Sequence, residues 1–151
     1  TWNFTTKFLQ NPVVNKTEKV SSPAIYRLAE MYLNKAEANA KLGNGQLALD
    51  DVNAIRRRAG LTGADLYAIG DLHGRNSILQ VVLDERRLEF AFEGGMRRDD
   101  LLRNNLPMIR NYGKPGVPGS NITVQPTDPR VIYFIPLNET NGITNSLEQN
   151  P

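Results

Sequence analysis

Residues 24–60, AIYRLAEMYLNKAEANAKLGNGQLALDDVNAIRRRAG, contain two stretches of helical periodicity separated by a Gly-Asn-Gly turn. In residues 24–42, apolar side chains recur at steps of three and four, which places them on one face of a helix. This stripe contains Ile25, Ala29, Tyr32, Ala36 and Ala40, and it is widened by Leu28 and Leu33. Gly43 suits the left-handed end of that helix, and Asn44 can cap the helix that follows.

A second helix is predicted over residues 46–59, and Gly60 ends it. Its inner stripe consists of Ala48, Val52, Ile55 and Ala59. Residues 24–60 therefore predict a helical hairpin, whose span is close to the roughly 34-residue tetratricopeptide unit. No second copy of this unit occurs in the chain. Because one hairpin cannot bury both of its faces, we expect it to pack against something else.

A third helix is predicted over residues 78–93, opened by the capping box Ser77-x-x-Gln80. It is apolar on much of its circumference, which is typical of a buried helix. Gly94-Gly95 interrupts it, and a short helix is expected over residues 98–104. Residues 104–130 are rich in Pro, Gly and Asn and predict a long loop, and residues 131–135 predict an extended, strand-like segment. A short strand is also expected at residues 5–9.

The predicted fold class is therefore mainly α, with a tetratricopeptide-like helical hairpin, a buried third helix and long irregular loops. Composition agrees with a globular chain, because 40% of the residues are hydrophobic and 23% are charged. The formal net charge is +2, too small to suggest nucleic acid binding. The chain has no cysteine and only one histidine, which argues against thiol catalysis and against a Cys- or His-rich metal site.

Charged residues are concentrated in the third predicted helix and just after it. Glu85, Glu89 and Glu93 recur at steps of four, so they line one side of a mostly apolar helix and need cations. One interpretation is that paired carboxylates perform acid/base chemistry, as in a glycosidase. Side chains on one helix point the same way, however, and cannot flank a bond from opposite sides. We therefore favour a buried structural network of ion pairs, and we predict no catalytic residue. The predicted members of this network are Glu85, Arg86, Glu89, Glu93, Arg97 and Asp100.

Three side chains are weaker candidates for contact with a ligand. Trp2 and Tyr67 have rings that can stack on a sugar, and His73 lies in a turn-like loop. The alternative is that each of them packs against its own loop. The sequence holds no phosphate-binding loop, dinucleotide-binding glycine motif or nucleophile elbow, so no cofactor is predicted.

Several blocks resemble one family in the same order along the chain. Residues 26–38 resemble the "R-x-A-E-x-Y-L…A-E-A" helix of SusD/RagB proteins, and residues 53–60 resemble their "N-x-I-R-x-R-A-G". Residues 85–94 and 97–103 resemble "E-R-x-x-E-L-x-x-E-G" and the "R-x-x-D-L-x-R" that follows it. Residues 135–151 resemble "I-P-x-x-E…N-x-x-L-x-Q-N-P" in parts. The chain departs from the pattern by an extra glycine at Gly94-Gly95 and by Arg98, where family members often carry an aromatic residue.

The resemblance implies a glycan- or nutrient-binding protein that is not an enzyme. Such proteins are lipid-anchored at the outer-membrane surface of Bacteroidetes cells. They bind an oligosaccharide or peptide and cap a SusC-like TonB-dependent outer-membrane transporter. Complete members are much longer, so we expect residues 1–151 to be one unit, the C-terminal part of a SusD-like domain. The N-terminal part, with the signal and the lipid-bearing cysteine, would be missing. The matched blocks are scaffold blocks, so no ligand-binding residue follows from them.

A second interpretation is a helical-repeat module that binds only protein and no glycan. Loss of glycan binding with retained binding to the transporter would favour that interpretation.

Overall fold

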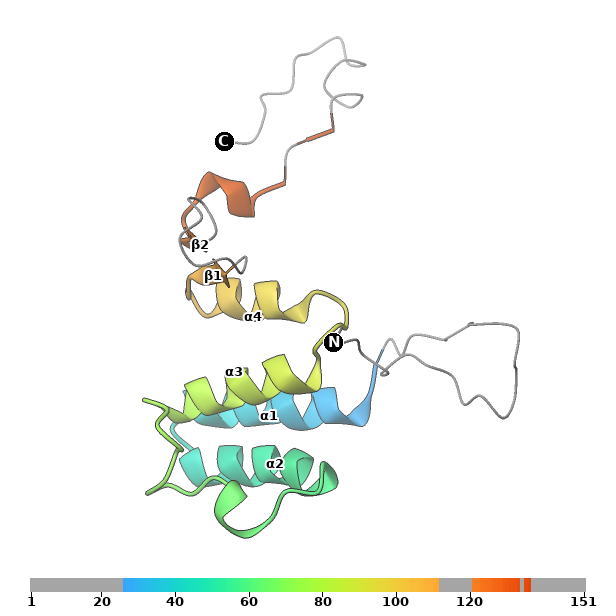
Figure 1. Ribbon diagram of the computed structural model, residues 1–151, viewed down its shortest axis with the longest axis vertical. Coiled ribbons are helices and arrows are strands. Elements are labelled where there is room, and N and C mark those ends of the chain that lie inside the picture. The colour runs from blue at the N-terminus through green and yellow to red at the C-terminus, as the bar shows by residue number, and fades with distance from the viewer. Residues whose placement is uncertain (1–25, 112–120, 134, 137–151) are drawn as a thin grey trace, which may run out of the picture. The chain divides into compact units, whose positions relative to one another are not determined.

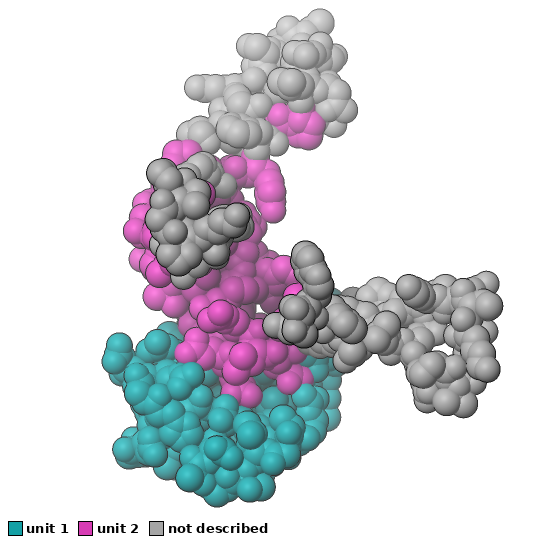
Figure 2. All heavy atoms as spheres, in the orientation of Figure 1, with its two compact units in different colours: residues 1–82 teal, residues 83–151 magenta. Residues whose placement is uncertain are grey.

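The computed structural model describes residues 26–111, 121–133 and 135–136, and these are mainly helical, as predicted (Figure 1). The described helices are α1 (Leu28–Lys41), α2 (Gly45–Arg58), α3 (Ile78–Glu89) and α4 (Met96–Arg103), with two short 3₁₀ helices and one pair of strands. Among the described residues, no helix has the length and apolar character needed to cross a membrane. The chain divides into two compact units, Thr1–Val82 and Leu83–Pro151 (Figure 2). The prediction of one SusD-like unit with a missing N-terminal part stays a prediction.

The first unit contains the predicted helical hairpin, in which α1 and α2 lie side by side (Figure 1). Its interface is formed by small and aliphatic side chains that are almost completely buried, which are Ala29, Leu33, Ala36, Ala48, Leu49, Val52 and Ile55. Alanine lets the two backbones approach closely, and leucine and valine fill the remaining space. At the margin, Lys35 Nζ lies 3.0 Å from Asp51 Oδ1 and joins the two helices by an ion pair.

The helix α1 is shorter and its buried face narrower than the periodicity predicts. Arg27 is extended (φ −145°, ψ 155°), so α1 begins at Leu28 rather than at residue 24. Leu28 is 71% exposed, and Tyr32 and Ala59 are also exposed. Leu28 and Tyr32 lie to one side of the Ala29–Leu33–Ala36 face, and a single partner helix covers only a limited arc of α1. Ile25 lies outside the described residues.

The ends of the hairpin helices depend on glycine. Gly43 has φ +81° and Gly60 has φ +91°, and this left-handed conformation terminates α1 and α2 as predicted. Asn44 precedes α2 but makes no side-chain capping hydrogen bond, so its predicted capping role is not observed. A β-carbon on Gly45 would lie 2.5 Å from Ile78 Cδ1 and 3.2 Å from Ile69 Cδ1, so a larger residue there would require these two isoleucine side chains to shift.

The loop between α2 and α3 is compact. It begins with a 3₁₀ helix, Gly63–Asp65, and continues into a tight turn. In that turn Ala68 and Asp71 exchange two backbone hydrogen bonds of 3.0 and 2.9 Å. The capping role of Ser77 is confirmed at the start of α3, because the Gln80 N–H donates to Ser77 Oγ at 3.1 Å. Gln80 Oε1 in turn accepts from the backbone N–H of Asn76 at 2.9 Å.

The helix α3 ends at Glu89, four residues before its predicted end, and it is not buried on all sides. Val81, Val82 and Leu83 are buried, but Leu88 is exposed. Phe92 lies beyond the helix with φ +66° and is also exposed. The third helix is therefore buried along one face, as its apolar character predicts, and is exposed at Leu88. Counting apolar residues cannot distinguish a fully buried helix from one that ends in an exposed apolar turn.

The second unit contains a β-hairpin inside the segment that was predicted as a loop. Strand β1 (Met108–Asn111) pairs antiparallel with β2 (Asn121–Val124), with Met108 opposite Val124 and Ile109 opposite Thr123. Met108, Ile122 and Val124 are half-buried, whereas Ile109 and Thr123 are exposed, which is the alternation of a sheet with one covered face. Four-residue strands are too short for this alternation to stand out among the surrounding prolines and glycines.

The strand predicted over residues 131–135 is wrong for the residues that the structure describes. Pro129–Val131 forms a 3₁₀ helix, and Ile132, Tyr133 and Ile135 belong to no strand. Pro129 fixes its φ near the helical value, and this local restriction prevails over the β propensity of the apolar run. The strand predicted at residues 5–9 lies outside the described residues.

Candidate functional site

The turn between α3 and α4 reverses the chain through unusual backbone conformations. Phe92, Gly94 and Gly95 have φ values of +66°, +44° and +69°. Glycine adopts such values without steric cost, whereas a bulky residue such as Phe92 does so rarely. Gly95 then serves as the N-cap of α4 in the left-handed conformation. The helix is therefore interrupted before Gly94-Gly95, and Glu93 and Arg97 do not continue the face that carries Glu85 and Glu89.

A buried ion pair joins α3 to α4 across this turn. Arg86 Nε lies 2.9 Å from Asp100 Oδ2, and the side chains are 3% and 1% exposed. Arg103 Nη1 also lies 2.6 Å from Asp100 Oδ1, one turn later on α4. Asp100 thus faces two guanidinium groups, which compensates for the loss of hydration of its carboxylate. The structure brings Arg86 and Asp100 together in this way.

Arg97 lies next to this pair but has a different environment. Its Nη1 donates to the carbonyl of Leu83 at 3.2 Å. Burial lowers the pKa of Arg97, and the positive charge of Arg87 lowers it further, while Asp84 and Asp100 act in the opposite direction. The guanidinium groups of Arg87 and Arg97 are therefore close enough to repel each other.

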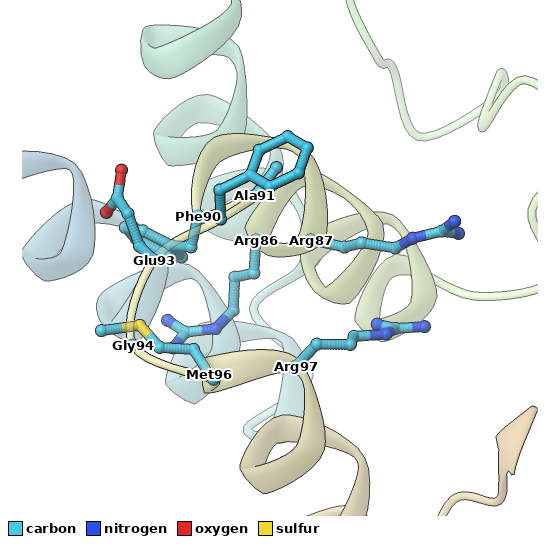
Figure 3. A pocket seen from close by; sticks show the side chains of 10 residues that line it. Arg86, Arg87, Phe90, Ala91, Glu93, Gly94, Met96 and Arg97 are labelled. Carbon is cyan, nitrogen blue, oxygen red and sulfur yellow. The ribbon is translucent and has the colours of Figure 1, made fainter. Parts of the chain in front are cut away.

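A pocket of about 430 Å³ lies at this turn, lined by Arg86 and Arg87 of α3 and by residues 90–97 of the turn and α4. Figure 3 shows Arg87 and Arg97 extending in the same direction, whereas the Glu93 carboxylate points to another side. Glu85 is buried in α3, and Glu89 and Glu93 are half-buried. The pocket thus presents positive charge and apolar surface, and within it no pair of carboxylates faces across a space that a scissile bond could occupy.

Tyr67, predicted as a weak candidate for sugar stacking, is packed inside its own loop. Its side chain is only 5% exposed. The Arg56 guanidinium lies 4.4 Å from the ring centroid, and the ring of His73 lies 4.6 Å away at an interplanar angle of 37°. The Asn53 amide fixes the backbone of Tyr67 by two hydrogen bonds of 2.8 and 2.9 Å. A ring covered in this way has little surface left for a ligand.

His73 occupies a turn with φ +49°, and its imidazole is partly exposed. Its backbone N–H donates to Asp71 Oδ1 at 3.0 Å, and its carbonyl accepts from Arg75 at 2.9 Å. Among the described residues, no group of three or more His, Cys, Asp or Glu side chains is placed to hold a metal ion. Trp2 lies outside the described residues.

Sequence reasoning did not identify Asn53, Arg56 and Arg87 as important positions. Asn53 and Arg56 belong to one of the quoted motif blocks, and their spacing of three places both on the side of α2 that meets the Tyr67 loop. The spacing of three could therefore have predicted that Asn53 and Arg56 contact the same neighbouring segment. The position of Arg87 beside Arg97 depends on the reversal of the chain at Phe92, which the sequence did not predict.

The described residues thus form a helical hairpin followed by two helices, α3 and α4, which a turn and a buried ion pair connect. Comparison with known proteins assigns the chain to a family. The family model described as "SusD family" matches residues 1–149, so the chain belongs to the SusD family. The chain is 36% identical over 103 residues to "SusD-like protein P38" of Formosa agariphila, covering 61% of this chain and 20% of the relative. It is 33% identical over 101 residues to "Starch-binding protein SusD" of Bacteroides thetaiotaomicron, covering 67% of this chain and 16% of the relative.

The matched part of the chain therefore spans only a fifth or less of the length of these curated relatives. No solved structure matches the chain with significance.

Proposed function

We propose that this chain is part of a nutrient-binding protein that captures a glycan at the cell surface and passes it to a SusC-like TonB-dependent transporter. The observation that carries this proposal is the match to the SusD family over residues 1–149. A relative named as a starch-binding protein supports a saccharide as the ligand. By the same reasoning we propose that the protein is held at the outer-membrane surface by a lipid anchor.

The proposed protein binds its ligand without changing it chemically. Asp100 already forms ion pairs with Arg86 and Arg103, so it is a poor proton donor or acceptor. Glu85 and Glu89 are one turn apart on α3 and point the same way from one helix. A glycosidase instead places two carboxyl groups on opposite sides of the scissile bond. These features support a binding role over a catalytic one.

The test uses the full-length protein that contains this chain, purified from outer-membrane extract under mild detergent. Mass spectrometry should identify a TonB-dependent barrel that co-purifies with it, and calorimetry should detect binding of an oligosaccharide. The products after prolonged incubation should be unchanged sugar. A preparation with adequate recovery but no barrel and no sugar binding would contradict the proposal, and release of shorter sugars would contradict the absence of catalysis.

A module that binds only protein is the second candidate, because apolar side chains of the hairpin remain exposed. Leu28, Leu42 and Leu47 are all more than half exposed in the described structure. We infer that a segment of a partner protein would cover these side chains in such a module. Recovery of the barrel without any measurable oligosaccharide binding would favour this candidate over the first.

A further inference from the structure

Arg87 and Arg97 are two positive charges that the fold holds together at the turn between α3 and α4. Both line the pocket of about 430 Å³, and both side chains extend in the same direction from their helices (Figure 3). Within the described residues, the Arg87 guanidinium has no hydrogen bond or ion pair, and Arg97 has only the carbonyl of Leu83. Two guanidinium groups in this arrangement repel each other unless an anion lies between or beside them.

The neighbouring acidic groups leave this positive charge largely uncompensated. Asp100 is engaged by Arg86 and Arg103, and the Glu93 carboxylate points to another side of the turn (Figure 3). Asp84 and Asp100 attract Arg97, but burial and the charge of Arg87 have the larger combined effect and lower the pKa of Arg97. The site therefore gains electrostatic stability if an external anion enters it.

The backbone and shape of the pocket add to the same preference. The first turn of α4 contributes Met96 and Arg97 to the pocket wall, and its N-cap, Gly95, has no side chain that could satisfy the helix end. A helix N-terminus carries partial positive charge and backbone N–H donors, which favour an anion. Phe92 also lines the pocket and is 75% exposed, so its ring is available for stacking. The volume is within the range of small-ligand sites.

We propose that this pocket binds the carboxylate or sulfate group of an acidic oligosaccharide, with Arg87 and Arg97 holding the anionic group and Phe92 contacting the adjacent sugar ring. This inference rests on the proposed nutrient-binding function and specifies the class of its ligand. Arginine suits the role because its planar guanidinium forms two parallel hydrogen bonds to a carboxylate or sulfate.

The experiment measures calorimetric affinities of the full-length protein for three probes: an oligogalacturonate, a sulfated galacto-oligosaccharide and a neutral malto-oligosaccharide. The variant Arg87→Gln removes one charge from an exposed side chain of α3. Arg57→Gln is its matched control, because Arg57 is an exposed helical arginine of α2 outside the pocket. We expect Arg87→Gln to weaken binding of an acidic probe by about tenfold or more, as the loss of a charge-assisted hydrogen bond does. Arg57→Gln should leave that affinity unchanged.

Three further measurements separate a ligand site from a structural charge. Added salt should weaken binding of the acidic probe but not of the neutral one. Arg87→Lys should restore part of the affinity, because it keeps the charge but loses the planar fork. Thermal unfolding should be nearly the same for Arg87→Gln and Arg57→Gln. Arg97→Gln is a second binding variant, interpreted only where its circular dichroism matches that of the unmodified protein.

Each alternative result overturns the inference in a recognisable way. Equal affinity for neutral and acidic sugars, with no effect of Arg87→Gln, would reject the acidic site but leave nutrient binding intact. An acidic peptide that binds through Arg87 while no acidic sugar does would reject the glycan assignment. A lower unfolding midpoint for Arg87→Gln without any change in affinity would show that the arginine pair is structural. No binding of any sugar would reject the proposed function itself.

Discussion

The α1–α2 hairpin and the α3–α4 segment each join two helices through a glycine-containing turn, but different interactions hold them together. Between α1 and α2, buried aliphatic side chains such as Leu33 and Val52 form the contact, and the ion pair of Lys35 lies at its margin. Between α3 and α4, a buried ion pair of Arg86 and Asp100 forms the link. An aliphatic contact tolerates small errors of position, whereas a buried ion pair requires both partners. Substitutions in the two regions should therefore have different consequences.

The largest effect is expected for Asp100→Ala. This change leaves the Arg86 guanidinium buried without its carboxylate, which costs about 3 to 5 kcal/mol in comparable buried pairs. Denaturant unfolding of the full-length protein measures the loss. Asp99→Ala is the matched control, because the neighbouring Asp99 side chain is mostly exposed and its contact with Arg98 is long at 3.4 Å. It should change the free energy of unfolding by no more than about 0.5 kcal/mol. Similar losses for both variants would show that the buried pair has no special importance.

The second-largest loss of stability is expected for a substitution in the aliphatic contact between α1 and α2. Leu33 is completely buried between α1 and α2, so Leu33→Ala removes apolar contacts and leaves a cavity. The expected loss is about 2 to 5 kcal/mol in the free energy of unfolding. Leu28→Ala removes the same atoms from an exposed position of the same helix and should cost far less. A loss at Leu28 as large as that at Leu33 would mean that the exposed face of α1 is covered in the full-length protein.

A smaller effect should follow from Asn53→Ala. The Asn53 amide accepts from the Tyr67 N–H and donates to the Tyr67 carbonyl, and both groups are buried. Leaving them unsatisfied should cost about 1 to 3 kcal/mol. Hydrogen exchange of the Tyr67 amide is the local measurement, and its protection should fall. Asn76→Ala, at an exposed position before α3, is the control and should not alter that protection.

The smallest effect is expected at the start of α3. Ser77→Ala removes the acceptor of the Gln80 N–H and should reduce stability by about 1 kcal/mol. Ser77→Thr keeps a hydroxyl at the cap and should recover most of that loss. Thermal unfolding of the two variants side by side is sufficient to compare them. An equal loss for alanine and threonine would contradict a capping role.

Local patterns predicted the parts of the fold that depend on neighbours in the sequence. The hairpin followed from apolar residues at steps of three and four, its ends followed from Gly43 and Gly60, and the start of α3 followed from Ser77 and Gln80. These features are set by backbone preferences and by contacts within one turn of a helix. Arg86 and Asp100 were among the residues predicted as a charged network, and the structure places them in contact.

The remaining features depend on contacts between residues distant in the sequence. The β1–β2 pair was missed because strand pairing is a non-local property, and the extended segment at residues 131–135 was predicted although Pro129–Val131 forms a 3₁₀ helix. The grouping of Glu85, Glu89, Glu93 and Arg97 on one face assumed a continuous helix, but α3 ends at Glu89. Glu93 consequently lies in the turn and Arg97 in α4, and their charged groups point to different sides (Figure 3).

The amino-acid sequence by itself determined the family, the helical class and the helical hairpin, because periodic burial and helix ends are encoded within short segments. Only the tertiary structure decided which charges meet. The reversal at Phe92, Gly94 and Gly95 brings Asp100 to Arg86 and Arg97 to Arg87. Ion pairing depends on distances of a few ångströms, and these distances are set by the direction in which a turn returns the chain, which the sequence pattern does not contain.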